Sequence, residues 1–164
     1  MATLFSTIND LFYKRVLKDP DFFQYTNVLE SEVLELMETS AYDYMIESIS
    51  TIKLYSEPTV DFDDYNDVQF NFDMTKTELQ IIVNLMFEKF LSRDRAKLKI
   101  YNKYFTTQEV NLFSPAAERD SFIKMLNSLE EKNKAEIKSY NSRDRLTGNI
   151  KSYNGVVIWY DRFR

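Results

Sequence analysis

The sequence predicts an all-α fold: a bundle of about four helices with an acidic loop and a C-terminal tail that is extended or forms a β-hairpin. Three observations lead to this prediction. Apolar residues recur at helical spacing in four segments of the 164-residue chain, and capping signals precede three of those segments. After Gly148 the pattern changes to that of strands. We therefore divide the chain into a helical domain, residues 1–148, and a tail for partner or neighbour contact, residues 149–164.

The segment 72–91 is predicted to form a central, buried helix. Its apolar residues follow the i, i+3, i+4, i+7 series and so share one face: Leu79, Ile82, Val83, Met86, Phe87, Phe90 and Leu91. Thr75 is placed to cap the free N–H groups, and Glu78 three residues later completes a capping box. Met74 is placed to pack on Leu79 at the helix start. Residues 92–105 are expected to continue this helix.

Two helices are expected before the central one. The first covers residues 4–17 and ends near Pro20, because proline disfavours helical conformation in the residue before it. The second covers about 27–56. Their predicted buried faces include Leu11 and Leu36.

The last helix is expected to start at Ser114-Pro115, with serine at the cap and proline in the first turn. Met125 is assigned to its buried face. The outer face at 130–134 is expected to be solvated charge, and Gly148 is taken as the end of the helical part.

Residues 57–73 are predicted to be a solvated loop whose charge is entirely acidic and whose aromatic residues turn inward. The centre of the loop contains four aspartates: Asp61, Asp63, Asp64 and Asp67. Their spacing is partly that of a calcium-binding loop. Asn66, however, occupies the position of the required glycine and Phe72 that of the bidentate glutamate, so we expect no metal site here.

Residues 150–164 have the composition of strands rather than helices. Asn154-Gly155 is the strongest two-residue hairpin signal in the chain, and a β-branched and aromatic run, 156–160, follows it. An isolated hairpin is marginally stable in water, so the tail is expected to pack either on its own helices or, as we favour, on a neighbouring subunit or partner. The residues assigned to this contact are Tyr153, Val156, Ile158, Trp159, Tyr160, Arg162, Phe163 and Arg164.

The composition argues against most catalytic classes. The chain contains no histidine and no cysteine, which removes the usual general base, thiol nucleophiles, disulfides and the common zinc or copper ligand sets. Its two glycines do not provide a phosphate-binding loop. We therefore expect a protein that is not an enzyme and has no cofactor or metal.

Nucleic-acid and membrane binding are also not favoured. Arg95, Lys99 and Lys103 form a basic edge near tyrosines, but the net charge is −5, so we interpret this edge as a solvated helix flank. No apolar run approaches the length of a bilayer span, and no helix has a basic amphipathic face. The N-terminus lacks the features of a signal peptide, so we expect a soluble intracellular product.

The net charge conceals a strong asymmetry along the chain. Residues 1–73 carry 4 basic and 15 acidic groups (−11), whereas residues 74–164 carry 17 basic and 11 acidic groups (+6). Oppositely charged halves favour head-to-tail contact between copies or a fixed orientation on a charged partner. Charges that segregate on a solvated surface without any role are an equally open alternative.

Two stretches carry a resemblance to a known family. They are the helix start at Phe72, Asp73, Thr75 and Glu78 with the apolar face up to Leu91, and the segment 111–116 with the helix that follows it to about Asp144. The segment 27–56 and the acidic loop match in layout. In these stretches the chain resembles the head–tail connector, or neck adaptor, family of tailed bacteriophages of Gram-positive bacteria.

The resemblance implies a structural virion protein that forms a cyclic homo-oligomer, an oligomeric ring, beneath the portal and joins head to tail during viral assembly. The implied partners are the portal protein and the next neck or tail component, with DNA passing nearby and no specific nucleic-acid binding. The implied location is the virion neck, and the host cytoplasm during assembly. The acidic loop is a candidate lining of the channel, because an acidic wall does not retain phosphates.

Two other functions stay open at this point. A tail-completion protein would occupy a neighbouring layer of the same particle. A small acidic regulatory protein that binds a host or phage protein belongs to a different class, and its acidic half would imitate nucleic acid. A regulator would act as a monomer or dimer, whereas a neck protein would stay in the particle.

Overall fold

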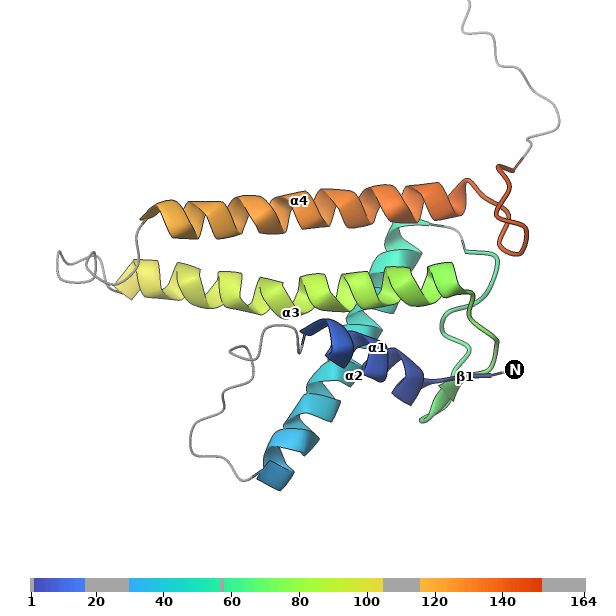
Figure 1. The fold of residues 1–164 in the computed structure, drawn as a ribbon, viewed down its shortest axis with the longest axis horizontal. Helices are drawn as coiled ribbons and strands as arrows, with labels where there is room; N and C mark the ends of the chain where they lie inside the picture. Colours follow the sequence, from blue (N-terminus) through green and yellow to red (C-terminus); the bar gives the residue numbers. More distant parts are fainter. Residues whose placement is uncertain (1, 17–29, 57, 105–115, 152–164) are drawn as a thin grey trace, which may run out of the picture.

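The computed structural model describes residues 2–16, 30–56, 58–104 and 116–151. This part of the chain is mostly helical, with four helices and a small two-stranded sheet (Figure 1). The helices are α1 (Phe5–Val16), α2 (Glu30–Tyr55), α3 (Lys76–Tyr104) and α4 (Ala116–Asn141), and the strands are β1 (Thr3–Leu4) and β2 (Gln69–Phe70). The prediction of a mostly helical chain is confirmed. The predicted tail hairpin lies outside the described residues.

Helix α3 is the centre of the fold, as predicted. It packs against α1, α2 and α4, and Figure 1 shows α4 alongside it over most of its length. Residues 81–86 are all buried, including Ile81 and Leu85, which lie outside the predicted apolar face. A helical segment that is buried on all sides is surrounded by other elements. The predicted face was therefore too narrow, because α3 has neighbours on several sides.

The predicted capping box at the start of α3 is confirmed. The Thr75 amide donates to Glu78 Oε2 at 2.7 Å, and the Glu78 amide donates to Thr75 Oγ1 at 3.3 Å. These two bonds satisfy backbone donors that a helix start leaves free. The N-terminus of the chain meets the same place, since Thr3 Oγ1 accepts a hydrogen bond from the Met74 amide at 2.8 Å.

The small sheet joins the N-terminus to the acidic loop. Strand β1 pairs antiparallel with β2, with Thr3 opposite Phe70 and Leu4 opposite Gln69. Two-residue strands have too few positions to show a period in the sequence, so this sheet was not predicted. It holds Phe5 and Phe70 in edge-to-face contact, with ring centroids 5.1 Å apart.

The aromatic residues of the loop turn inward, as predicted. Phe62 and Phe70 are buried, and Tyr65 and Phe72 pack against the core as half-buried residues. Phe62 meets Phe72 edge-to-face at 5.6 Å between ring centroids. The loop therefore has a core of its own, which fixes its backbone while its charged side chains face solvent.

Five details of the predicted helices are corrected. Leu11, Leu36 and Met125 were assigned to buried faces but are 38%, 46% and 49% exposed. Asn133 was assigned to a solvated face but is only 2% exposed, because α3 packs over that side of α4. Helix α4 ends at Asn141, and Gly148 lies in the turn beyond it with a φ of 72°, a conformation that favours glycine.

We expect Leu85→Ala to lower the free energy of unfolding by about 2–5 kcal/mol, because it opens a cavity in the centre of the fold. Leu54→Ala is the matched control, since the same atoms are removed from a side chain that is 75% exposed, and its effect is expected to stay within about 0.5 kcal/mol. Urea unfolding followed by circular dichroism measures both. Equal losses in the two variants would contradict the central position of α3.

Candidate functional site

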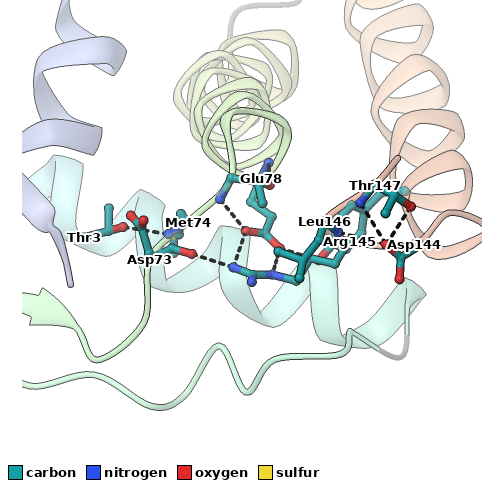
Figure 2. Close-up of polar contacts among 10 residues, drawn as sticks. Thr3, Asp73, Met74, Glu78, Asp144, Arg145, Leu146 and Thr147 are labelled. Carbon is teal, nitrogen blue, oxygen red and sulfur yellow. Dashed lines mark hydrogen bonds and ion pairs between the residues drawn. The ribbon is translucent and has the colours of Figure 1, made fainter. Parts of the chain in front are cut away.

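Glu78 is a buried carboxylate at which three parts of the chain meet (Figure 2). Its Oε1 accepts hydrogen bonds from Arg145 Nε at 2.7 Å and from the Tyr140 hydroxyl at 2.6 Å. Its Oε2 accepts from Arg145 Nη2 at 3.0 Å and from the Thr75 amide at 2.7 Å. A buried charge is tolerated when it is paired and hydrogen-bonded in this way. We call Glu78, Tyr140 and Arg145 the anchor.

The anchor keeps Glu78 ionised despite its burial. Burial by itself would raise the pKa of the Glu78 carboxyl, but the hydrogen bonds from Arg145, Tyr140 and Thr75 outweigh it, and the pKa is lowered. Burial and the carboxylate of Glu78 together raise the pKa of the Tyr140 hydroxyl. With four donors on its two oxygens, Glu78 is not available as a general base. The anchor therefore has a structural role: it connects the start of α3 to α4 and to the turn after α4.

The turn that follows α4 is held in one conformation. Asp144 Oδ1 accepts hydrogen bonds from the Thr147 amide and hydroxyl, both at 2.8 Å, and these bonds lower the pKa of the Asp144 carboxyl (Figure 2). Arg145 Nη2 also donates to the Asp73 carbonyl at 2.5 Å. The Lys151 amide donates to the Ser142 carbonyl at 2.9 Å. The anchor and this turn thus fix the point from which residues 152–164 continue.

An open pocket of about 410 Å³ lies beside the anchor. Gln80 of α3, Ser139 of α4 and Arg143 of the turn contribute to its wall. Two aliphatic residues near it are strongly exposed: Leu146 at 81% and Ile150 at 73%. This surface is the part of the described chain nearest in sequence to the predicted tail contact.

A second polar group inside the core joins three helices. Asn84 of α3 accepts a hydrogen bond from Arg15 Nη1 of α1 and donates to Glu136 Oε2 of α4 at 2.7 Å. One turn further along, Asn133 Nδ2 donates to Glu88 Oε2 at 2.7 Å. These hydrogen bonds join buried polar side chains of α3 to α1 and α4, so they fix how α1 and α4 lie on α3.

The part of the acidic loop that was predicted to face a channel is exposed to solvent. All four of its central aspartates are exposed: Asp61, Asp63, Asp64 and Asp67. Asp63 pairs with Lys53 of α2, and Asp64 Oδ1 accepts a hydrogen bond from Asn71 at 2.6 Å. Among the described residues, no group of three or more acidic side chains is arranged to hold a metal ion.

The predicted tail contact lies outside the described residues. It comprises Tyr153, Val156, Ile158, Trp159, Tyr160, Arg162, Phe163 and Arg164. The side chains of the predicted basic edge at 95–103 are outside them as well. The structure instead brings together Glu78, Tyr140 and Arg145, which the sequence analysis did not connect. Glu78 was noticed only for its cap, and no local pattern points to partners more than 60 residues away.

The chain matches no protein-family model, and no similar curated protein or solved structure was found. The resemblance to neck adaptors therefore remains a prediction based on the quoted residues. In the described part of the chain, none of the helices combines the length and the apolar character needed to span a bilayer.

We expect Arg145→Ala to lower the free energy of unfolding by about 3–5 kcal/mol, because it leaves the buried charge of Glu78 without its cation. Arg143→Ala is the control: the Arg143 side chain is exposed and, within the described part of the chain, donates to the Gly148 carbonyl, so a loss of about 1 kcal/mol or less is expected. Both are measured by urea unfolding. A loss as small for Arg145 as for Arg143 would show that the anchor does not stabilise the fold.

Glu78→Gln is expected to change how stability depends on pH. Since folding lowers the pKa of Glu78, its charge stabilises the fold above the ordinary value of 4.5, and this contribution is lost as the pH falls below that value. The wild type should therefore exceed the variant in stability at pH 7, and the difference should shrink between about pH 5 and pH 3. Urea midpoints across this range test it. A difference that does not vary with pH would contradict the lowered pKa.

Proposed function

We propose that this chain is a structural phage virion protein, a head–tail connector that forms a ring beneath the portal. The class of protein is taken from the resemblance to neck adaptors. One observation supports assembly: three ion pairs of the fold, Lys53–Asp63, Glu78–Arg145 and Lys132–Glu136, each join residues of the same half of the chain. These pairs do not offset the charge difference between residues 1–73 and 74–164. In the proposal, this charge difference serves contact between copies or with a partner.

In this proposal the four helices form a bundle within residues 1–148, and residues 149–164 are an extended or hairpin tail that contacts the portal or a neighbouring copy. The anchor supports this arrangement, since it fixes the place where the tail leaves α4. The chain has no catalytic activity or cofactor in this proposal. Its function is to connect two assemblies through surfaces on opposite sides.

The acidic loop is the proposed lining of the DNA channel. Its aspartates are exposed, while Phe62 and Phe70 hold its backbone against the core. A rigid, negatively charged wall repels phosphates, so DNA passes without being held. A ring of such loops requires that each copy contact the next through two different surfaces.

The proposal predicts that the full chain is present in multiple copies in purified phage particles, at the neck. A phage that supplies only residues 1–151 should lose this incorporation, because the tail contact is missing. Quantitative mass spectrometry of particles measures both, and electron microscopy locates the density. Circular dichroism of residues 1–151 is the control, since unchanged helical content excludes a folding defect.

Two outcomes would contradict this proposal. A chain that is absent from particles and forms a 1:1 complex with a host or phage protein early in infection would indicate the regulatory alternative. Incorporation of residues 1–151 at the level of the full chain would remove the role of the tail.

A further inference from the structure

A groove of about 320 Å³ lies between α1 and α3. Leu11, Leu79 and Val83 give it an apolar floor, and the cations Arg15 and Lys76 lie along it. None of the described residues that line it is acidic. Leu11 is 38% exposed there, although the periodicity of α1 assigns it to the buried face. An apolar floor with cations beside it fits an apolar side chain that is flanked by carboxylates.

The position of Arg15 is fixed within this groove. Its guanidinium donates to Asn84 and lies over the Phe87 ring, 4.7 Å from the centroid. A cation that is already held in place loses little conformational entropy when an anion binds it. Lys76 is exposed in the first turn of α3, where the free N–H groups of the helix start add positive potential. The groove is therefore prepared for an acidic partner.

The N-terminal half of α2 has the complementary chemistry. In Figure 1 this half extends away from α3 and α4. Leu36 is 46% exposed on it, and Asp43 is exposed on the same face, since residues seven apart on a helix share a face. Glu35, next to Leu36 in the chain, is exposed on the flank of that face. From Glu30 to Ile52 the helix contains acidic residues and no basic one. We call Glu35, Leu36 and Asp43 the acidic ridge.

We propose that the acidic ridge of one copy binds in the α1/α3 groove of the next copy. Leu36 then covers Leu11 and Val83, and Glu35 and Asp43 lie near Arg15 and Lys76 of the neighbour. This inference deepens the proposed function and rests on it for the ring, but the contact itself is a property of the isolated chain. It assigns the two surfaces that a head-to-tail assembly needs: the ridge lies within residues 1–73, and the groove combines Leu11 and Arg15 with residues 76–84.

The contact is heterologous, because groove and ridge are different surfaces of the chain. Each copy bound at its groove still presents a free ridge, so association continues until the assembly closes. A second copy is favoured over an unrelated acidic protein, because the chain itself supplies an exposed leucine between carboxylates. The charges also make the contact sensitive to salt.

Disulfide trapping tests the contact directly, since the chain has no cysteine of its own. Leu11→Cys and Leu36→Cys chains are mixed and oxidised, and a mixed dimer is expected in excess over either homodimer. The control mixes Leu11→Cys with Leu54→Cys, whose side chain is 75% exposed and outside the ridge. The excess should be lost in this control and should fall as salt is raised.

Exchanging the charges of the groove and the ridge, which we call a charge exchange, distinguishes the specific contact from random collision. Adding Lys76→Glu to the Leu11→Cys chain is expected to lower the yield of mixed dimer about two- to fivefold. Adding either Glu35→Lys or Asp43→Lys to the Leu36→Cys chain should then restore it in one of the two cases, since the reversed residue faces the glutamate introduced at position 76 while Arg15 keeps the other carboxylate. Lys76→Glu places an anion in the first turn of α3, which helices favour, so the fold is not at risk.

The outcomes distinguish this inference from the proposed function. A mixed dimer no more abundant than in the Leu54→Cys control, or a charge exchange that does not restore it, overturns the groove contact even where the chain is found in particles. A trapped and charge-restored dimer from a chain absent from particles supports the contact and overturns the neck assignment alone.

Discussion

The fold depends on the buried charge of Glu78. The same carboxylate completes the cap of α3 and receives Arg145 and Tyr140 from the other end of the described chain. The cap of α3 and the contacts with Tyr140 and Arg145 therefore use the same carboxylate. A buried carboxylate is tolerated only where its partners are present. Thr3 bonds to Met74 next to it, so the N-terminus, the start of α3 and the turn after α4 meet in one place. This requirement favours one arrangement of the helices over others with similar apolar contact.

The predictable part of the fold is the part encoded at short range. Thr75 and Glu78 are three residues apart, and the cap they form follows from sequence spacing alone. The salt bridge of Glu78 with Arg145 joins residues 67 apart, and spacing carries no information about it. Burial was predicted from helical periodicity, which identifies a face but not its width. That is why Leu85 was missed on α3, which has neighbours on several sides, and Leu11 was wrongly placed inside.

The polar residues in the core indicate long-range contacts that helical periodicity does not predict. Asn84 and Glu88 interrupt an otherwise apolar part of α3, and polar groups in such positions need partners. The structure supplies Arg15 and Glu136 for Asn84 and Asn133 for Glu88. A sequence shows that such partners must exist, but only the tertiary arrangement identifies them. The exposure of the acidic loop was predictable for the opposite reason, since a charged side chain on a surface loop needs no distant partner to be stable.

The distribution of charge connects the fold to the proposed assembly. Lys53 and Asp63 are ten residues apart and Lys132 and Glu136 four, so these pairs form within one half and leave the difference between the halves unchanged. The acidic side of α2 lies on a helix whose N-terminal half extends away from α3 and α4 in Figure 1. In the proposed contact, a second copy brings Arg15 and Lys76 to that helix without rearranging the core, because both cations already lie in an open groove. In the proposed assembly, association lowers the electrostatic free energy of both surfaces.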